Sequence, residues 1–223
     1  MSFATEVWPE DVFAARMAER ITSRLPASGA VVITGGTTAA KVYAALDDVG
    51  AWAGLDVLFS DERCVPPGHP ESNHKMATEL FLGRTGATVH RMPGELEPAL
   101  GARRYHDEIA EIVVGGPHLA FMGMGADCHV GALYPGSPAL DDPNYCAAVD
   151  RPDGMQGLTL TPTAMLACEV IDLIVTGEEK AEAVARVVGG AELPMTCPAR
   201  VLADHPRVTL CLDEPAAKSL DKS

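Results

Sequence analysis

The chain has 223 residues, 47% of them hydrophobic, and its 17 basic and 31 acidic side chains give a formal net charge of −14. A charge of this sign and size repels nucleic acid and anionic membranes, so we expect neither as a partner, and an anionic ligand would need a local cationic pocket. No apolar run approaches the roughly 18 residues of a membrane span, the start of the chain lacks a signal-peptide pattern, and the six cysteines form no CxxC pair, so we expect a cytoplasmic protein with reduced thiols and no structural zinc.

Short apolar runs alternate along the chain with stretches of helical period. The strand-like runs are residues 30–34, 55–60, 118–123, 158–161, 170–177 and 207–213. The helical stretches are residues 9–25, 37–46, 72–82, 103–113 and 178–188. This order predicts an α/β fold in which a mostly parallel, open, Rossmann-like sheet carries helices on both faces. No stretch has the composition of a linker, so residues 1–223 are predicted to form one domain.

Ligands of open α/β sheets bind beyond the carboxyl ends of the strands, and three of the predicted strands end in unusual residues. The first is followed by Gly35, Gly36, Thr37 and Thr38. Glycines let the backbone approach a ligand, and N–H groups at a helix start form a natural phosphate cradle. The same residues would also suit a plain tight connection. They match neither a GxGxxG nor a Walker sequence, which disfavours dinucleotide and ATP binding.

The second strand ends in Asp61, Glu62 and Arg63. An arginine at a strand end can hold phosphate or carboxylate oxygens with two parallel hydrogen bonds while neighbouring acids orient it. A surface salt bridge is the alternative interpretation. Ser72 and Asn73 are predicted to cap the next helix, where an asparagine could also serve a ligand.

The third strand leads into GMGADCHVGALYPG, residues 123–136. Three contiguous residues cannot easily surround one metal ion, and no second ligand pair is present. Cys128 and His129 make a poor nucleophile–base pair because adjacent side chains in extended backbone diverge. An imidazole oriented by a carboxylate remains: His129 could take a proton from water while Asp127 fixes its tautomer. A half-buried histidine closing a turn is the alternative.

With these residues in view, the chain resembles the 6-phosphogluconolactonases and, more distantly, the glucosamine-6-phosphate deaminases, over most of its length. The segments that carry the resemblance are ITGGTTAAKVYAAL, SDERCVPPGHPESNHKMATELFL, GMGADCHVGALYPG, VTGEEKAEAV and HPRVTLCLDEPAA. LYPG after the histidine and the short chain favour the lactonase branch. The resemblance implies a NagB-like fold and hydrolysis of 6-phospho-D-glucono-1,5-lactone to 6-phosphogluconate, without a metal or organic cofactor.

Carried over by position, the resemblance implies that His129 is the general base with Asp127 beside it. It places Gly35, Gly36, Thr37, Thr38, Arg63 and Lys180 in the sugar-phosphate pocket. Water activated by His129 would attack C1 of the lactone, and backbone donors would stabilise the oxyanion. The expected partner is this small phosphosugar lactone, and the expected state is a monomer or weak homodimer.

Several positions depart from the family pattern. Cys128 stands where the family has glycine, Val130 where it has threonine, and Gly157 where it has arginine, with Arg151 nearby in the sequence. A positive φ at residue 128 would cost a cysteine about 1 kcal/mol or more. The alternatives are therefore a deaminase-like enzyme, which would want a further acid near His129, and a non-catalytic phosphosugar-binding protein, which would not need His129.

Overall fold

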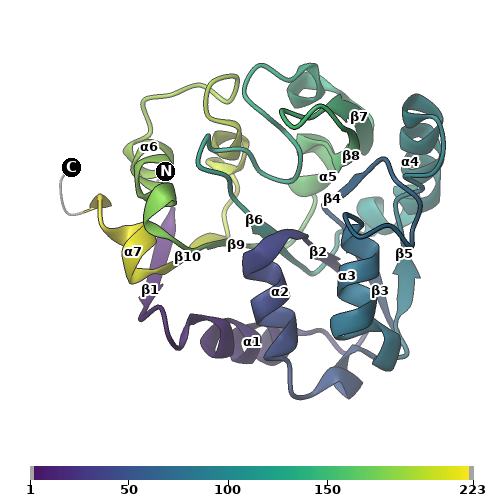
Figure 1. The fold of residues 1–223 in the computed structure, drawn as a ribbon, viewed down its shortest axis with the longest axis horizontal. Coiled ribbons are helices and arrows are strands. Elements are labelled where there is room, and N and C mark those ends of the chain that lie inside the picture. The colour runs from purple at the N-terminus through teal and green to yellow at the C-terminus, as the bar shows by residue number, and fades with distance from the viewer. Residues whose placement is uncertain (1–2, 221–223) are drawn as a thin grey trace.

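The computed structural model describes residues 3–220, and its main sheet has seven strands in the order β1-β10-β9-β6-β2-β3-β5 (Figure 1). These strands are β1 (Ala4–Trp8), β2 (Gly29–Ile33), β3 (Leu55–Phe59), β5 (Thr88–His90), β6 (Leu119–Gly123), β9 (Val170–Val175) and β10 (Val208–Asp213). Every neighbouring pair in this sheet is parallel. The predicted mostly parallel sheet is confirmed.

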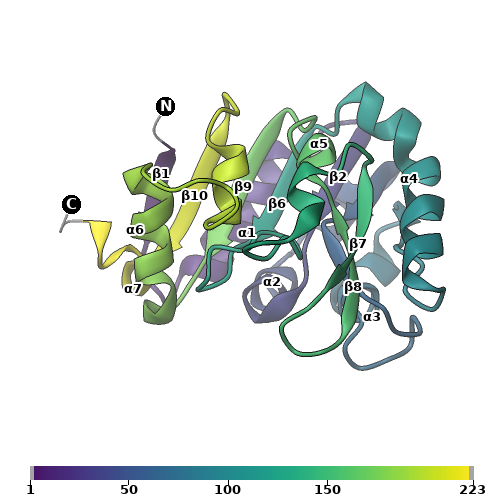
Figure 2. The same cartoon turned by 90° about the horizontal axis from the view of Figure 1, so that it is seen from above.

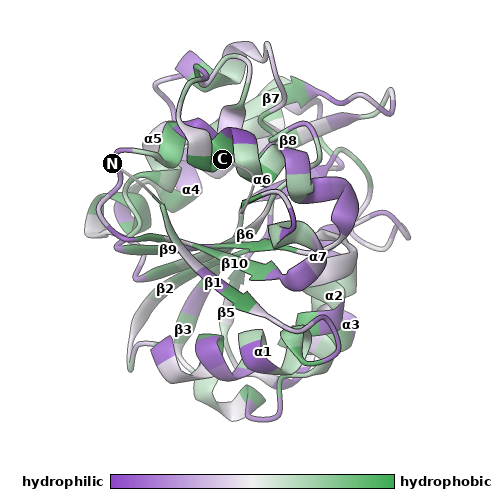
Figure 3. Cartoon of the chain, turned by 90° about the vertical axis from the view of Figure 1, so that its left-hand side faces the viewer, coloured by the Kyte–Doolittle hydropathy of each residue, from purple (hydrophilic) through white to green (hydrophobic). Residues whose placement is uncertain are grey.

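Helices cover both faces of the sheet, as predicted. The α-helices are α1 (Phe13–Arg24), α2 (Gly36–Ala44), α3 (Asn73–Leu80), α4 (Pro98–Gly115), α5 (Pro162–Met165), α6 (Ala181–Gly189) and α7 (Glu214–Ala217). Short 3-10 helices are η1 (Val49–Trp52), η2 (Leu82–Arg84), η3 (Pro138–Asp141), η4 (Glu178–Lys180) and η5 (Pro198–Leu202). Seen along the sheet, α1, α2 and α3 lie on one face, and α4, α5 and α6 lie on the other (Figure 3).

A second, antiparallel sheet has three strands in the order β4-β8-β7. They are β4 (Asp61–Arg63), β8 (Gln156–Leu160) and β7 (Cys146–Asp150), and α4 lies beside β7 and β8 (Figure 2). The run at 158–161 thus belongs to this small sheet and not to the parallel one. A bend at Ser60 joins β3 to β4 and connects the two sheets. Ser60 N–H donates to Ile33 O of the main sheet, and Leu160 N–H of the small sheet donates to Ser60 O.

The central strands of the main sheet are apolar on both faces because helices cover both faces. Val31, Val32 and Ile33 of β2 are all buried. On the α2 side, an aromatic cluster fills the core: the ring of Phe81 lies 4.7 Å from that of Tyr43 and 4.9 Å from that of Trp52. Within residues 3–220, no helix is long and apolar enough to cross a membrane.

Candidate active site

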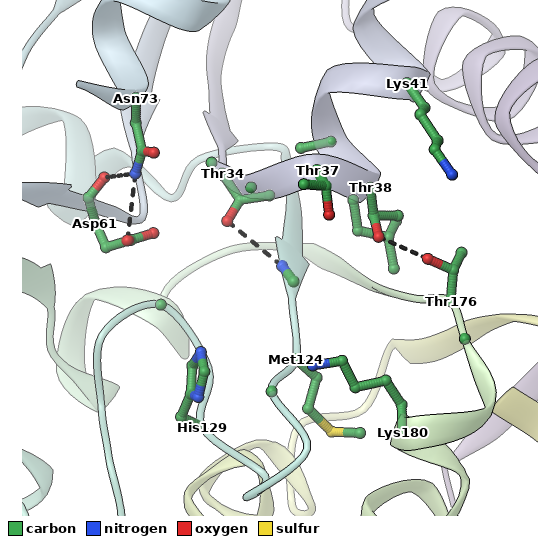
Figure 4. Close-up of a pocket in the computed structure, with 18 of the residues that line it drawn as sticks. Thr34, Thr37, Thr38, Lys41, Asp61, Asn73, Met124, His129, Thr176 and Lys180 are labelled. Atoms are coloured by element: carbon green, nitrogen blue, oxygen red, sulfur yellow. Dashed lines mark hydrogen bonds between the residues drawn. The ribbon is translucent and has the colours of Figure 1, made fainter. Parts of the chain in front are cut away.

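A cavity of about 410 Å³ lies beyond the carboxyl ends of β2, β6, β9 and β10 (Figure 4). This is the edge of a parallel sheet at which ligand sites are expected. The predicted site residues that line the cavity are Gly35, Gly36, Thr37, Thr38, Arg63, His129 and Lys180. Asp127 does not line it but contacts His129. The fold therefore brings together residues that are up to 145 positions apart, between Gly35 and Lys180.

The first part of the site is the start of α2. Gly35 precedes the helix, and no side chain caps it. Gly36 has a φ of +92°, a conformation that favours glycine. Uncapped N–H groups with the positive end of the helix dipole attract an anion. The Oγ1 atom of Thr38 lies 2.6 Å from that of Thr176, which fixes the side of the helix next to β9.

Asn73 and Arg63 flank α2 on its other side. A Cβ atom on Gly35 would come within 1.9 Å of Oδ1 of Asn73, so only glycine fits there. Asn73 Oδ1 accepts a hydrogen bond of 2.6 Å from Nη1 of Arg63, which also donates to Glu71 O. Both acceptors are uncharged, so the guanidinium of Arg63 keeps its charge for a ligand.

Glu62 organises this side of the site. Its buried carboxylate accepts hydrogen bonds from the N–H groups of Arg63, Asn73 and His74 and from the Ser72 hydroxyl. Ser72 accepts from Lys75 N–H, which confirms it as the N-cap of α3. Burial raises the pKa of Glu62, and the four hydrogen bonds oppose that shift. Glu62 is thus a structural acid, while Asp61 on the same strand lines the cavity.

Lys180 enters the cavity from the turn that follows β9. Gly177 has a φ of +99°, and its N–H donates to both carboxylate oxygens of Asp213, at 3.1 and 3.0 Å. Asp213 is 1% exposed, and it also caps α7 through Ala216 N–H. No ion pair of Lys180 is found among residues 3–220. Its ammonium group faces the open space between α2 and His129 (Figure 4).

His129 and Asp127 form a close pair on the opposite wall. Nδ1 of His129 lies 2.6 Å from Oδ1 of Asp127, which also accepts the His129 N–H at 3.2 Å. A Cβ atom on Gly125 would come within 2.1 Å of Nδ1, so the pair fits only against a glycine. The ring centroid of Tyr134 lies 4.7 Å from that of His129 and supports the imidazole from the side.

The protonation of this pair follows from Asp127. Partial burial raises its pKa, but the hydrogen bonds and the charge of His129 outweigh burial and lower the pKa to about 2. An ionised carboxylate accepts hydrogen bonds and cannot donate. Nδ1 of neutral His129 must therefore carry the proton, which leaves the Nε2 lone pair free. This arrangement can accept a proton from a water molecule in the cavity.

Cys128 has a φ of +68°, so the backbone at this position has the strain that a positive φ costs a cysteine. Its side chain is buried and points at α6, where Sγ lies 3.8 Å from Ala183 O. Cys128 does not line the cavity. A hydrogen bond with the Cys197 thiol lowers the pKa of Cys128, yet a thiol that faces away from the cavity cannot attack a ligand there.

Several site residues were missed from the sequence. Tyr134, Thr176 and Asp213 line the cavity, and Gly125 makes room for the histidine. Gly125 could have been noticed, because it lies in the glycine-rich turn before Asp127. Asp213 carries no local signal, since only tertiary structure brings it to the site. Arg151, noted in the sequence as lying near Gly157, also lines the cavity. Tyr43, which follows Lys41 on α2, is fully buried and donates to Thr34 O, so it belongs to the core.

Within residues 3–220, no group of three or more His, Cys, Asp or Glu side chains could hold a metal ion. The six cysteines, all inside this range, are free thiols.

Comparison with known proteins shows which family this chain belongs to. Residues 9–210 match the family described as glucosamine-6-phosphate isomerases/6-phosphogluconolactonase. The chain belongs to this family. A 6-phosphogluconolactonase of Synechocystis sp. is 30% identical over 203 residues, which cover 86% of this chain and 85% of the relative. A glucosamine-6-phosphate deaminase of Rhodopirellula baltica is 34% identical over 223 residues, which cover 89% and 87%.

A solved structure, the 6-phosphogluconolactonase from Trypanosoma cruzi, superposes with a TM-score of 0.87 at 22% identity and covers 99% of this chain and 98% of that one. At this identity the likeness bears on the fold alone, and it confirms the expected NagB-like architecture. Because the family contains both lactonases and deaminases, the site must decide between the two activities.

Proposed function

We propose that this protein hydrolyses 6-phospho-D-glucono-1,5-lactone to 6-phosphogluconate, as one domain over residues 1–223. The observation that carries the proposal is the His129–Asp127 pair, which presents an unprotonated Nε2 to a cavity with a cationic, uncapped helix start on its other side. A lactone with a phosphate at one end and an ester at the other needs these two features at a distance from each other.

The proposed reaction begins with the phosphate held by residues 35–38, Arg63 and Lys180. His129 takes a proton from water through Nε2, and the resulting hydroxide attacks C1 of the lactone. The C1–O bond of the ring breaks, and the protonated imidazole returns its proton to the leaving ring oxygen. Asp127 stabilises the imidazolium that forms in between, because it is ionised and only 2.6 Å from Nδ1. No metal or organic cofactor takes part in this scheme, and the protein acts as a monomer or weak homodimer.

The second candidate function is deamination of glucosamine 6-phosphate. The similarity of the chain to the Rhodopirellula baltica deaminase favours this candidate. That reaction must open a sugar ring and move a proton between carbons, and it requires a further acid near the histidine besides Asp127. Residues 130–136, which follow His129, contain no acidic side chain. The lactone is therefore the better substrate for this site.

Activity assays with both substrates test the proposal. Purified protein should accelerate hydrolysis of freshly made 6-phosphogluconolactone above the spontaneous rate and should release no ammonia from glucosamine 6-phosphate. His129→Ala should lower kcat about 100-fold or more with a modest change in KM, since general-base catalysis contributes at least this much.

His118→Ala is the matched control, because His118 pairs with Glu169 and does not line the cavity. Wild-type turnover in His129→Ala would refute the proposed role of His129. Ammonia release without lactone hydrolysis would favour the deaminase.

A further inference from the structure

The small sheet presents one of its faces to the cavity. In the antiparallel pairing of β4 with β8, Asp61 lies opposite Thr159 and Arg63 lies opposite Gly157. Directly opposed residues of an antiparallel pair project from the same face. Because Asp61 and Arg63 line the cavity, a side chain at position 157 would also point toward it. Because Gly157 has no side chain, this space is open to another residue.

Arg151 occupies the space above Gly157. It follows the last residue of β7, in the turn that joins β7 to β8. A Cβ atom on Gly157 would come within 3.2 Å of Cδ and 3.5 Å of Cγ of Arg151, so the aliphatic part of the arginine lies directly on the glycine. The Arg151 side chain is only 10% exposed, and it lines the cavity.

The guanidinium of Arg151 is held in place by two hydrogen bonds and, within the part of the chain that the structure describes, keeps an N–H donor free for a ligand. Nε and Nη2 donate to Oδ2 of Asp153, at 3.2 and 3.1 Å. No hydrogen bond of Nη1 is found among residues 3–220. The guanidinium carbon lies 5.8 Å from the ring centroid of Tyr134, the same ring that supports His129. Arg151 therefore stands one aromatic ring away from the proposed base.

Arg63 thus reaches the cavity from β4, and Arg151 reaches it from the β7–β8 turn, where it lies over Gly157 of β8, the residue paired with Arg63. Arg63 bonds only to uncharged oxygens, and Arg151 has one carboxylate partner at the surface. Two neighbouring guanidinium groups with free N–H donors form a site for a doubly charged oxyanion, and arginine is the side chain best shaped for phosphate.

We propose that Arg151 is a specificity-determining residue that binds the phosphate monoester of the substrate together with Arg63, and that Gly157 is there to make room for it. The inference rests on the proposed function for the identity of the phosphosugar, but it is tested by binding alone. It gives this chain a phosphate contact that comes from the β7–β8 turn and not from β8 itself.

Calorimetric binding of 6-phosphogluconate and of gluconate tests the proposal. Wild-type protein should bind the phosphorylated compound more tightly. Arg151→Gln should weaken 6-phosphogluconate binding about 30-fold, as expected for loss of a charged contact inside a pocket, and should leave gluconate binding unchanged. Arg16→Gln is the control, because Arg16 pairs with Glu19 on the surface of α1 and lies outside the cavity.

An exchange of the two positions gives a second test. The double variant Arg151→Gly with Gly157→Arg puts an arginine on the same sheet face from β8 and should recover most of the preference for the phosphorylated ligand. Circular dichroism shows whether each variant is folded, and Arg151→Lys, which keeps the charge and the aliphatic stem, replaces Arg151→Gln if that variant does not fold; it should lose part of the preference.

Equal weakening of both ligands, unchanged binding of 6-phosphogluconate in a folded Arg151 variant, or a folded double variant without recovery would each overturn the proposal. Lactone hydrolysis by the wild type is measured separately. If binding depends on Arg151 as expected but no lactone is hydrolysed, the proposed activity fails and the phosphate contact stands.

Discussion

At the scale of single residues, the ionised Asp127 decides what His129 can do. Its pKa of about 2 keeps the carboxylate charged at any pH at which the protein would work, so the tautomer of neutral His129 is fixed. Gly125 makes the short contact possible, because any side chain there would displace the imidazole. Gly125, Asp127 and His129, all within one tight turn, are therefore needed together to form the general base.

The pKa of Asp127 predicts a pH-dependent stability. It is lower in the fold than its ordinary value of 3.8, so the carboxylate stabilises the folded state above about pH 4, and this contribution is lost as the pH falls toward 2. Asp127→Asn should lower the Tm most near pH 5, and the gap to wild type should shrink by roughly half at pH 3. Thermal melts over this range measure it, with Asp11→Asn as the exposed control; a gap that does not vary with pH would contradict the assignment.

Cys128 gives a second prediction at this scale. At a φ of +68°, glycine is favoured over other residues by about 1 kcal/mol. Cys128→Ala keeps this strain and loses the buried sulfur, whereas Cys128→Gly loses the sulfur and relieves the strain. The glycine variant should therefore be the more stable of the two, by about 1 kcal/mol in chemical denaturation.

Both Cys128 variants should keep turnover within a few-fold of wild type, because the thiol faces α6 and not the cavity. An inactive Cys128→Ala protein, or a lactone-derived adduct on Cys128 in mass spectrometry, would replace water activation with covalent catalysis.

At the scale of elements, Glu62 connects the small sheet to α3. Each of its two oxygens accepts two hydrogen bonds from groups at the start of α3 and on β4. Burial of the carboxylate is costly, and this cost is offset only while all four donors are satisfied. By accepting hydrogen bonds from their backbone N–H groups, Glu62 fixes the positions of Arg63 and Asn73 in the site.

Glu62→Gln should destabilise the protein by about 1–3 kcal/mol, because the amide nitrogen cannot accept the two hydrogen bonds that one oxygen now receives. Glu95→Gln, which removes a surface pair with Arg91, is the matched control and should cost about 1 kcal/mol or less. Urea denaturation of both variants measures the difference. Equal losses would contradict the claim that the four hydrogen bonds of Glu62 offset the cost of its burial.

The elements also show how far the sequence could be interpreted. Residues 30–34, 118–123 and 170–177 read as buried strands because central parallel strands are apolar on both faces. β1 and β5 were missed, because both lie at sheet edges and are short or largely exposed. The run at 158–161 was assigned to the wrong sheet, since apolar character shows burial but not partner or direction. The GGTT and D-x-H segments were found because they are local. The sequence placed Arg151 near Gly157, but only the pairing of β7 and β4 with β8 shows that it lies over Gly157 and on the same sheet face as Arg63.

At the scale of the whole molecule, a negative net charge surrounds a cavity in which four cationic side chains stand among four acidic ones. The chain carries −14 in formal charge, yet Lys41, Arg63, Arg151 and Lys180 gather in one cavity. A phosphorylated substrate is therefore repelled at long range and attracted only near the site. The repulsion acts over a longer range than the attraction, so a moderate salt concentration should weaken the repulsion more.

The Debye length is about 30 Å at 0.01 M and about 8 Å at 0.15 M ionic strength. Raising the salt concentration between these values should screen the repulsive field of the whole protein before it screens the short contacts inside the cavity. We therefore expect kcat/KM for 6-phosphogluconolactone to rise several-fold over this range, while kcat/KM for uncharged gluconolactone stays constant. Initial rates at low substrate concentration, corrected for spontaneous hydrolysis at each salt concentration, measure both. A steady fall for the phosphorylated substrate would mean instead that the cationic cavity dominates the field at long range and that the acidic surface does not oppose substrate entry.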